Sequence, residues 1–228
     1  MTRCTHCLKT LKKRTKDHVF PSSWYPANTP SYVQRWTVPS CTECNGKFGK
    51  LENNLFPKLA LCVDPQKAEA SGITKKVLVL FGIGVNNISE KEKLTRETIR
   101  KKFLKEVKSY SSKIKPFPGL GFHKDFPKKL QVCISVPPEL IPVLEKIIRG
   151  VEYKLGKRYI EPPYKLKIYH IFEEPKEIQK VLKYSVITSL GPGFRVERVV
   201  SSNQTSPVLY KTTIWGTLIS YASIDRIK

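Results

Sequence analysis

The chain has few acidic residues and no long hydrophobic run. Only 19 of its 228 residues are aspartate or glutamate, against 41 lysines and arginines, which gives a formal net charge of +22. The longest apolar run, Val77 to Val85, is far shorter than the roughly 20 residues that span a bilayer. The first residues also lack the apolar stretch of a secretory signal. We therefore expect a cytoplasmic protein with no membrane-spanning segment.

The excess of positive charge predicts a polyanionic partner. Lysine and arginine side chains that neutralise phosphates release condensed counterions, so a strongly basic surface binds DNA or RNA without reading its sequence. A membrane surface is also anionic, but without a spanning segment nucleic acid is the expected partner. Because 40% of the residues are hydrophobic and 26% are charged, the composition is that of a folded protein with a packed core.

Hydrophobic patterning divides the chain into three segments. Residues 1–60 form a compact unit with cysteine pairs and short strands. Residues 61–115 form a basic helical connector, with an amphipathic helix from Glu90 to Lys115 and a strand or helix end from Val77 to Phe81. Residues 116–228 form the third segment, and the Pro- and Gly-rich stretch from Lys115 to Phe122 marks its boundary with the connector. A chain of this length can hold a small module and a second domain with its own core, and we favour that division.

The third segment predicts an α+β domain with a mainly antiparallel sheet. A helix begins at Pro137-Pro138 and ends at Leu155, before Gly156, and a short helix begins at Pro175. The predicted strands are Leu130 to Val136, Tyr164 to Phe172, Phe194 to Val200, Val208 to Trp215 and Thr217 to Ile224. The segment also contains His123, His170 and the basic stretch from Arg149 to Arg158. The spacing of these residues matches neither a metal site nor a catalytic nucleophile with its base. The sequence therefore predicts no role for this domain.

Four of the six cysteines form two C-x-x-C pairs, Cys4 with Cys7 and Cys41 with Cys44. In a reducing compartment such pairs indicate a metal rather than disulfides, and four thiolates are a common tetrahedral set for Zn²⁺. A redox C-x-x-C is the alternative, but two pairs that bracket one short segment favour structural zinc. His6 is expected to be an exposed residue of the first knuckle. Cys62 and Cys133 lie in apolar surroundings and are expected to be inert buried thiols.

Between the cysteine pairs, the sequence Asp17-His18-Val19-Phe20-Pro21 joins an acidic residue to a histidine, and Asn45 directly follows the last cysteine. The order C-x-x-C, Asp-His-x-x-Pro and C-x-x-C-Asn resembles the zinc-containing branch of the HNH endonuclease family, over about residues 4–56. The resemblance implies a ββα-metal module, in which a two-stranded hairpin packs on a helix. The predicted fold is therefore α+β, with a zinc-stapled HNH module, a basic helical connector and an antiparallel α+β domain.

The resemblance also implies a mechanism. His18 would be the general base that deprotonates a water molecule, while Asp17 and Asn45 would hold Mg²⁺ or Mn²⁺ against the scissile phosphate. Imidazole accepts a proton near neutral pH, and carboxylate and amide oxygens suit these hard cations. Because neighbouring strand residues point to opposite faces, a bend or bulge would be needed to bring Asp17 and His18 into one site. The expected substrate is double-stranded DNA, although the sequence leaves RNA open.

Some positions depart from the family pattern or have a plainer interpretation. Trp36 stands where the family has an asparagine that braces the loop holding the histidine. Another residue must then brace this loop, and Asn28 is a candidate. Phe48 stands where the family often has a lysine. Asn45 could instead cap the following helix. Trp24 and Trp36 could stack on bases, but core packing is the favoured interpretation. Five basic residues are candidate phosphate contacts, namely Lys13, Arg14, Lys16, Lys47 and Lys50.

The main alternative is a protein of another class. In that hypothesis the chain is a non-catalytic, zinc-dependent nucleic-acid-binding protein, and the third segment makes most of the contacts. It predicts tight, salt-sensitive binding without cleavage under any divalent cation.

Overall fold

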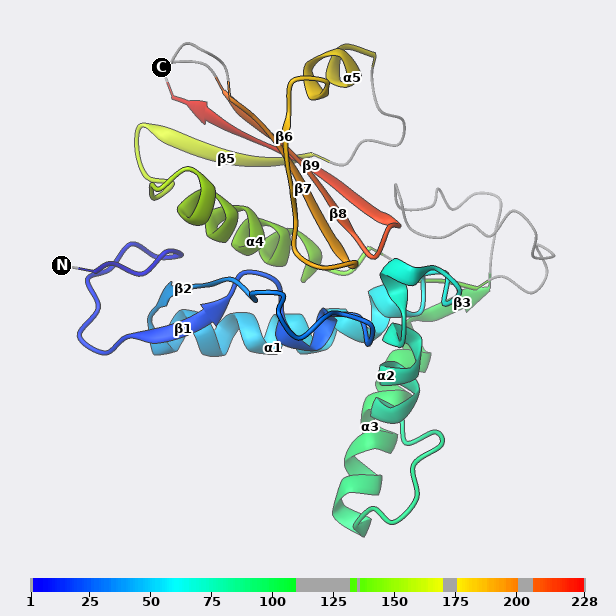
Figure 1. Cartoon of the computed structure of the whole chain (residues 1–228). Coiled ribbons are helices and arrows are strands. Elements are labelled where there is room, and N and C mark those ends of the chain that lie inside the picture. The colour runs from blue at the N-terminus through cyan, green and yellow to red at the C-terminus, as the bar shows by residue number, and fades with distance from the viewer. Residues whose placement is uncertain (1, 110–131, 135, 170–175, 201–206, 228) are drawn as a thin grey trace.

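The computed structural model describes residues 2–109, 132–134, 136–169, 176–200 and 207–227 (Figure 1). Its first part is an antiparallel hairpin of β1 (Thr15–His18) and β2 (Thr37–Ser40), followed by helix α1 (Thr42–Ala60). Cys41 caps α1, because its sulfur accepts a hydrogen bond from the Cys44 backbone amide at 3.4 Å. The second cysteine pair therefore also sets where the helix begins.

The middle of the chain is helical and projects from the far end of α1 (Figure 1). The short helix η2 (Ala68–Ala70) precedes α2 (Ile73–Leu80), and α3 (Glu90–Glu106) follows, whereas the short helix η1 (Ser22–Trp24) lies in the loop between β1 and β2. Of the two interpretations of Val77 to Phe81, the helical one is confirmed for all but the last residue. The basic helix predicted from Glu90 is confirmed as far as Glu106, after which β3 (Val107–Ser109) begins. In the described part of the chain, no helix is both long enough and apolar enough to cross a membrane.

The C-terminal part is built on an antiparallel five-stranded sheet in the order β5-β9-β8-β7-β6. These strands are β5 (Tyr164–Tyr169), β6 (Val186–Ser189), β7 (Phe194–Val200), β8 (Val208–Ile214) and β9 (Leu218–Arg226). Alternate residues of β8 are buried, as expected for a sheet that covers a core on one face. The mainly antiparallel α+β prediction is therefore confirmed, and β4 (Val132–Ile134) pairs separately with β3.

Helix α4 (Leu140–Leu155) lies between the five-stranded sheet and the N-terminal hairpin with α1 (Figure 1). It begins and ends close to the predicted positions, with Gly156 as its C-cap. The short helix expected at Pro175 is α5 (Lys176–Leu182). The parts of the predicted third segment outside the described residues include His123, His170 and the stretch from Lys115 to Phe122.

The hydrophobic core is shared by all three predicted segments. One cluster of buried residues runs from Val19 in the hairpin region to Ile224 in β9 and includes Val77 of α2. Helix α4 packs against the module and the sheet at once, so the described residues share one core, and the division of the chain into domains stays a prediction. The approach is close at Gly150 of α4, where a Cβ atom would lie 2.9 Å from Cγ2 of Val19.

Candidate metal centre and the adjoining ion cluster

The four cysteines of the two C-x-x-C pairs converge. The sulfur atoms of Cys4, Cys7, Cys41 and Cys44 all lie within 4.8 Å of one another, and the sulfurs of Cys7 and Cys41 are 3.8 Å apart. Four sulfurs that each lie about 2.3 Å from a tetrahedral Zn²⁺ are separated from one another by about 3.8 Å. The four sulfurs therefore form a cluster that could hold a structural metal ion.

Backbone amides favour the thiolate of Cys4, whereas burial and the neighbouring thiols raise the pKa values of Cys7 and Cys44. Burial alone would raise the pKa of the Cys4 thiol, but backbone amides of Cys7, Cys41 and His6 lower it to about 7. The Cys41 amide lies 3.4 Å from the Cys4 sulfur. A thiol must lose its proton to bind zinc, so these amide donors prepare Cys4 for that role. Such a site is closed, because protein ligands fill its coordination sphere, and it holds the fold together rather than performing chemistry.

The structure places His6 in the interior rather than on the surface. Its side chain is 2% exposed, and its Nε2 atom lies 2.9 Å from Oδ2 of Asp17. The ring also packs edge-on against Phe48, with ring centroids 4.8 Å apart. The prediction of an exposed knuckle residue is therefore wrong. His6 instead links the first cysteine knuckle to strand β1, and Phe48 fills the space beside it where the family often has a lysine.

Asp17 is buried and contacts His6 and a lysine ammonium. In addition to His6, its Oδ1 atom lies 3.0 Å from the ammonium of Lys146 on α4. Burial by itself would raise the pKa of this carboxyl, but His6 and Lys146 outweigh it and hold the pKa below its usual range. Each carboxylate oxygen thus already has a charged or hydrogen-bonding partner from the chain.

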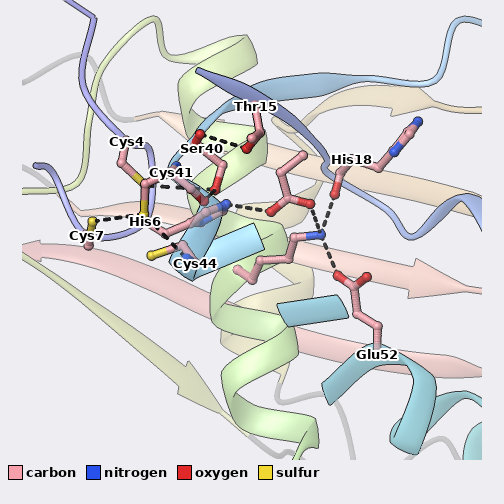
Figure 2. A network of polar contacts seen from close by, with 11 residues as sticks. Cys4, His6, Cys7, Thr15, His18, Ser40, Cys41, Cys44 and Glu52 are labelled. Carbon is pink, nitrogen blue, oxygen red and sulfur yellow. Dashed lines mark hydrogen bonds and ion pairs between the residues drawn. The ribbon is translucent and has the colours of Figure 1, made fainter. Parts of the chain in front are cut away.

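Lys146 is the centre of a buried ion cluster. Its side chain is fully buried, and its ammonium contacts the carboxylates of Asp17 and Glu52 and the backbone carbonyl oxygen of His18. Three hydrogen-bond donors on the ammonium meet three acceptors, so the buried charge is fully satisfied. The cluster joins β1, α1 and α4, and Figure 2 shows Glu52 reaching it from α1.

His18 lies at the edge of this cluster, but its ring points away from it (Figure 2). The strand pairs regularly through its last residue, with Asp17 opposite Val38 and His18 opposite Thr37. Without a bulge, adjacent side chains face opposite sides of the strand. The bend that would bring Asp17 and His18 into one site is absent from β1. As the chain is folded here, Asp17 turns inward to Lys146, which counts against its expected role as a cation ligand.

The imidazole of His18 is partly buried and favours its neutral form. Burial lowers the pKa of this side chain, and the positive charges of Lys146 and Arg35 lower it further, while Asp17 opposes the shift. A neutral imidazole can accept a proton, which is what a general base requires. Asn45 lies in the first turn of α1, where its backbone amide donates to the Cys41 carbonyl at 3.0 Å.

The five candidate phosphate contacts are all exposed. Lys13, Arg14 and Lys16 lie before or within β1, while Lys47 and Lys50 lie on α1. None of them forms an ion pair with another described residue. Their ammonium and guanidinium groups are therefore available to an anion that approaches the hairpin or the helix.

The loop between the two strands is braced by groups that sequence reasoning only partly identified. The Asn28 side chain donates to the Ala68 carbonyl at 3.1 Å, as its candidate role as a brace suggests. The Trp36 carbonyl accepts from the Val19 amide at 2.9 Å. Trp24 is buried, and the indole of Trp215 donates to its carbonyl at 2.7 Å. Core packing is thus confirmed for Trp24, and Trp36 packs partly buried against the same core.

Sequence reasoning missed Lys146, Glu52 and the role of His6. A weak indication existed for Lys146, because it lies among apolar residues of a predicted helix and shares a face with Val143 and Gly150. A lysine on such a face is rarely fully buried unless it is paired. Nothing in the sequence identifies its partners, since these lie on other elements.

Comparisons with known proteins do not assign the chain to a family. No family model matches it, and no curated protein or solved structure matches it either.

Proposed function

We propose that the chain is a metal-dependent endonuclease of the HNH type, with His18 as the general base and DNA as the expected substrate. The proposal depends mainly on His18, whose imidazole is partly exposed and favours its neutral form. His18 lies at the end of β1, in a hairpin that the cysteine cluster joins to α1. A hairpin followed by a helix supports the ββα arrangement that the resemblance implies. The net charge of +22 supports a polyanionic substrate.

The proposed chemistry requires water, a base and a cation. His18 would take a proton from the water that attacks phosphorus, which is worth about 10²- to 10⁴-fold in rate. Mg²⁺ or Mn²⁺, when bound, would stabilise the charge on the departing oxygen. Asn45 and the phosphate oxygens would hold this cation. Asp17 could join them only by leaving Lys146, and unpairing such a buried charge costs about 3–5 kcal/mol.

The ion cluster favours a second candidate, which is binding of nucleic acid without hydrolysis. The ammonium of Lys146 already pairs with both Asp17 and Glu52 beside His18. A divalent cation that needs Asp17 would compete with this ammonium. In this second proposal the zinc-clamped module positions its exposed lysines and arginines on the phosphates, and no bond is broken.

One cleavage assay separates the two candidates. The purified chain is incubated with plasmid DNA, single-stranded DNA and RNA, with Mg²⁺ or Mn²⁺, beside His18→Ala and Asp17→Asn variants. The endonuclease proposal expects His18→Ala to lose cutting by about 10²-fold or more while its zinc content and melting temperature stay unchanged. Equal cutting by wild type and His18→Ala would remove His18 from the mechanism.

The Asp17→Asn variant tests the cation separately. If Asp17 exchanges Lys146 for the cation, this variant loses cutting and needs more Mg²⁺ to recover it. If Asp17 serves only the ion cluster, the variant melts at a lower temperature but keeps its dependence on Mg²⁺. Salt-sensitive binding by the wild type with no cutting under any cation would favour the second candidate.

A further inference from the structure

A cleft of about 450 Å³ opens between α1, α2 and α3, on a part of the molecule that the proposed chemistry does not use. Its volume falls in the range of small-molecule sites. Much of its lining is apolar, and this part consists of Phe56, Pro57, Leu80, Ile99 and Phe103. Phe56 and Phe103 contribute aromatic surface to this lining, although the Phe56 ring also packs against Trp24 and the Phe103 ring against Phe81.

Two carboxamides lie at this cleft without partners. Asn53 and Asn54 are exposed residues of α1 that line it, and neither side chain forms a hydrogen bond with any described residue. Each carboxamide offers two donors and one acceptor oxygen. Such groups match the mixed donor and acceptor edge of a nucleobase, which asparagine commonly reads.

The cations at the cleft differ in availability. Lys58 is paired with Glu106 at 2.8 Å, and Lys76 donates to the backbone carbonyls of Ser23 and Tyr25 at 3.0 and 2.6 Å. Lys102 is exposed and forms no ion pair with another described residue. Glu106, the acidic residue of the lining, pairs with Lys58, which also lies 3.5 Å from Glu139 outside the lining. The charge left at the cleft is therefore positive.

We propose that this cleft takes one unstacked nucleotide of a single-stranded nucleic acid. Its base would lie on the apolar lining, Asn53 and Asn54 would bind the base edge, and Lys102 would contact a phosphate. Stacking of splayed bases on aromatic side chains and hydrogen bonding of their edges is how proteins read single strands. The proposal rests on the nucleic-acid binding in the proposed function, but not on hydrolysis at His18.

The position of the cleft links it to the candidate active site. Asn53 directly follows Glu52, whose carboxylate holds the Lys146 ammonium beneath His18. Ser23, which also lines the cleft, lies in η1, and a short loop joins η1 to His18 at the end of β1. A strand that passes His18 along α1 would therefore reach the cleft. A base within a duplex remains stacked and cannot enter, so the cleft favours a single strand or an extruded base.

The test compares an intact single-stranded oligonucleotide with a fully abasic oligomer of the same length, by fluorescence anisotropy and without added divalent cation. Both probes carry the same phosphates, so the difference in affinity reports contacts to bases. We expect the wild-type chain to bind the intact strand roughly 5- to 150-fold more tightly, as stacking of one base predicts. An Asn53→Ala/Asn54→Ala variant and an Ile99→Trp variant, which fills the cleft, should lose most of this difference.

Matched controls protect the test against misfolding. Leu94→Trp adds the same side chain to the same helix at a position that is 61% exposed and does not line the cleft, so it should keep the wild-type difference. The asparagine substitutions are at exposed positions, so these variants should melt like the wild type. Equal affinity of the wild type for both probes, or an undiminished difference in the folded variants, would overturn the proposal.

This result is independent of the cleavage assay. If bases are preferred but no substrate is cut, the cleft proposal stands and the endonuclease proposal fails. If plasmid is cut but the abasic oligomer binds as well as the intact strand, the nuclease stands and the cleft is not a nucleotide site.

Discussion

The ammonium of Lys146 on α4 lies 3.0 Å from the carboxylate of Asp17 on β1, and both side chains are buried. The same ammonium binds Glu52 on α1 and the carbonyl oxygen of His18. A residue from the C-terminal half of the chain thus completes the interior of the N-terminal module. We infer that the N-terminal module with the cysteine cluster depends on α4 for its structure, and that residues 1–60 alone would leave two carboxylates without the Lys146 ammonium.

The first prediction concerns this cluster. Replacing Lys146 with methionine keeps much of the side-chain volume but leaves the Asp17 and Glu52 carboxylates without their buried counterion. Breaking a buried ion pair from one side costs about 3–5 kcal/mol. We expect the free energy of unfolding to fall by about that amount, measured by urea denaturation. Lys154→Met, in the last turn of the same helix, is the matched control and should change stability little.

A triple variant separates charge from packing. Lys146→Met combined with Asp17→Asn and Glu52→Gln removes the ammonium and both carboxylates together. Because no charge is then left without a partner, we expect this variant to recover much of the lost stability. A triple variant as unstable as Lys146→Met alone would show that packing of the lysine chain, rather than its charge, stabilises the junction.

The second prediction concerns the cysteine cluster. The purified chain should contain one zinc ion per molecule, measured by elemental analysis. Zinc held by four thiolates contributes on the order of 10 kcal/mol to folding, so Cys7→Ser should lose zinc and unfold the hairpin. Cys62→Ser is the control, because that thiol lies outside the cluster and donates to the Lys58 carbonyl at 3.1 Å. A Cys7→Ser chain with unchanged zinc content and melting temperature would contradict the assignment.

The sequence predicted helices and strands well where a local pattern of residues is enough to specify them. The strand at Phe194 to Val200 and the helix that ends before Gly156 agree with β7 and α4, because the alternation of apolar residues and a terminating glycine are local features. The cysteine cluster was also predictable, since paired spacing and shared chemistry point to one ion. These are patterns that a few neighbouring residues carry by themselves.

The ion cluster was not predictable, for a physical reason. The partners of Lys146 come from β1 and α1, and only the packing of α4 against both brings them together. The same packing merges the cores that the sequence suggested were separate. His6 illustrates the point as well, because its place between two cysteines suggested a surface position. Its burial follows from Asp17 on the neighbouring strand.

The third prediction concerns the titration of His18. Burial lowers the pKa of its imidazole, with Lys146 and Arg35 adding to the shift, so NMR should show it titrating below the ordinary value of about 6.5. The folded state then binds fewer protons than the unfolded state. Its contribution to stability is complete above pH ~6.5 and is lost as the pH falls through the lowered pKa. If His18 is the general base, the acid limb of kcat/KM should follow the same lowered pKa.

Two variants check this interpretation. His18→Gln identifies the resonance. The triple variant without the charges of Lys146, Asp17 and Glu52 should bring the pKa of His18 closer to its ordinary value, because the lost effect of Lys146 is larger than the opposing effect of Asp17 that is lost with it. A His18 resonance that titrates above about 6.5 in the wild type would contradict the neutral base on which the proposed mechanism depends.

The fourth prediction uses two helix glycines that the sequence alone cannot distinguish. A Cβ atom added at Gly49 of α1 would meet nothing within 4 Å, whereas one added at Gly150 of α4 would lie 2.9 Å from Cγ2 of Val19. Alanine is favoured over glycine within a helix, so Gly49→Ala should stabilise the chain by about 0.4–1 kcal/mol. Gly150→Ala should destabilise it by about 1–3 kcal/mol, because the hairpin must move away from α4.

Urea denaturation of both variants measures these changes, and the nucleic-acid assays give Gly49 a second use. This glycine lies between Asn45 and Asn53 on α1, and positions four apart share a helix face. If a strand passes His18 along this face, the added methyl group stands where the strand approaches, so the variant should bind nucleic acid more weakly while being more stable. A Gly49→Ala chain that is more stable and binds equally well would place the strand on another face of α1.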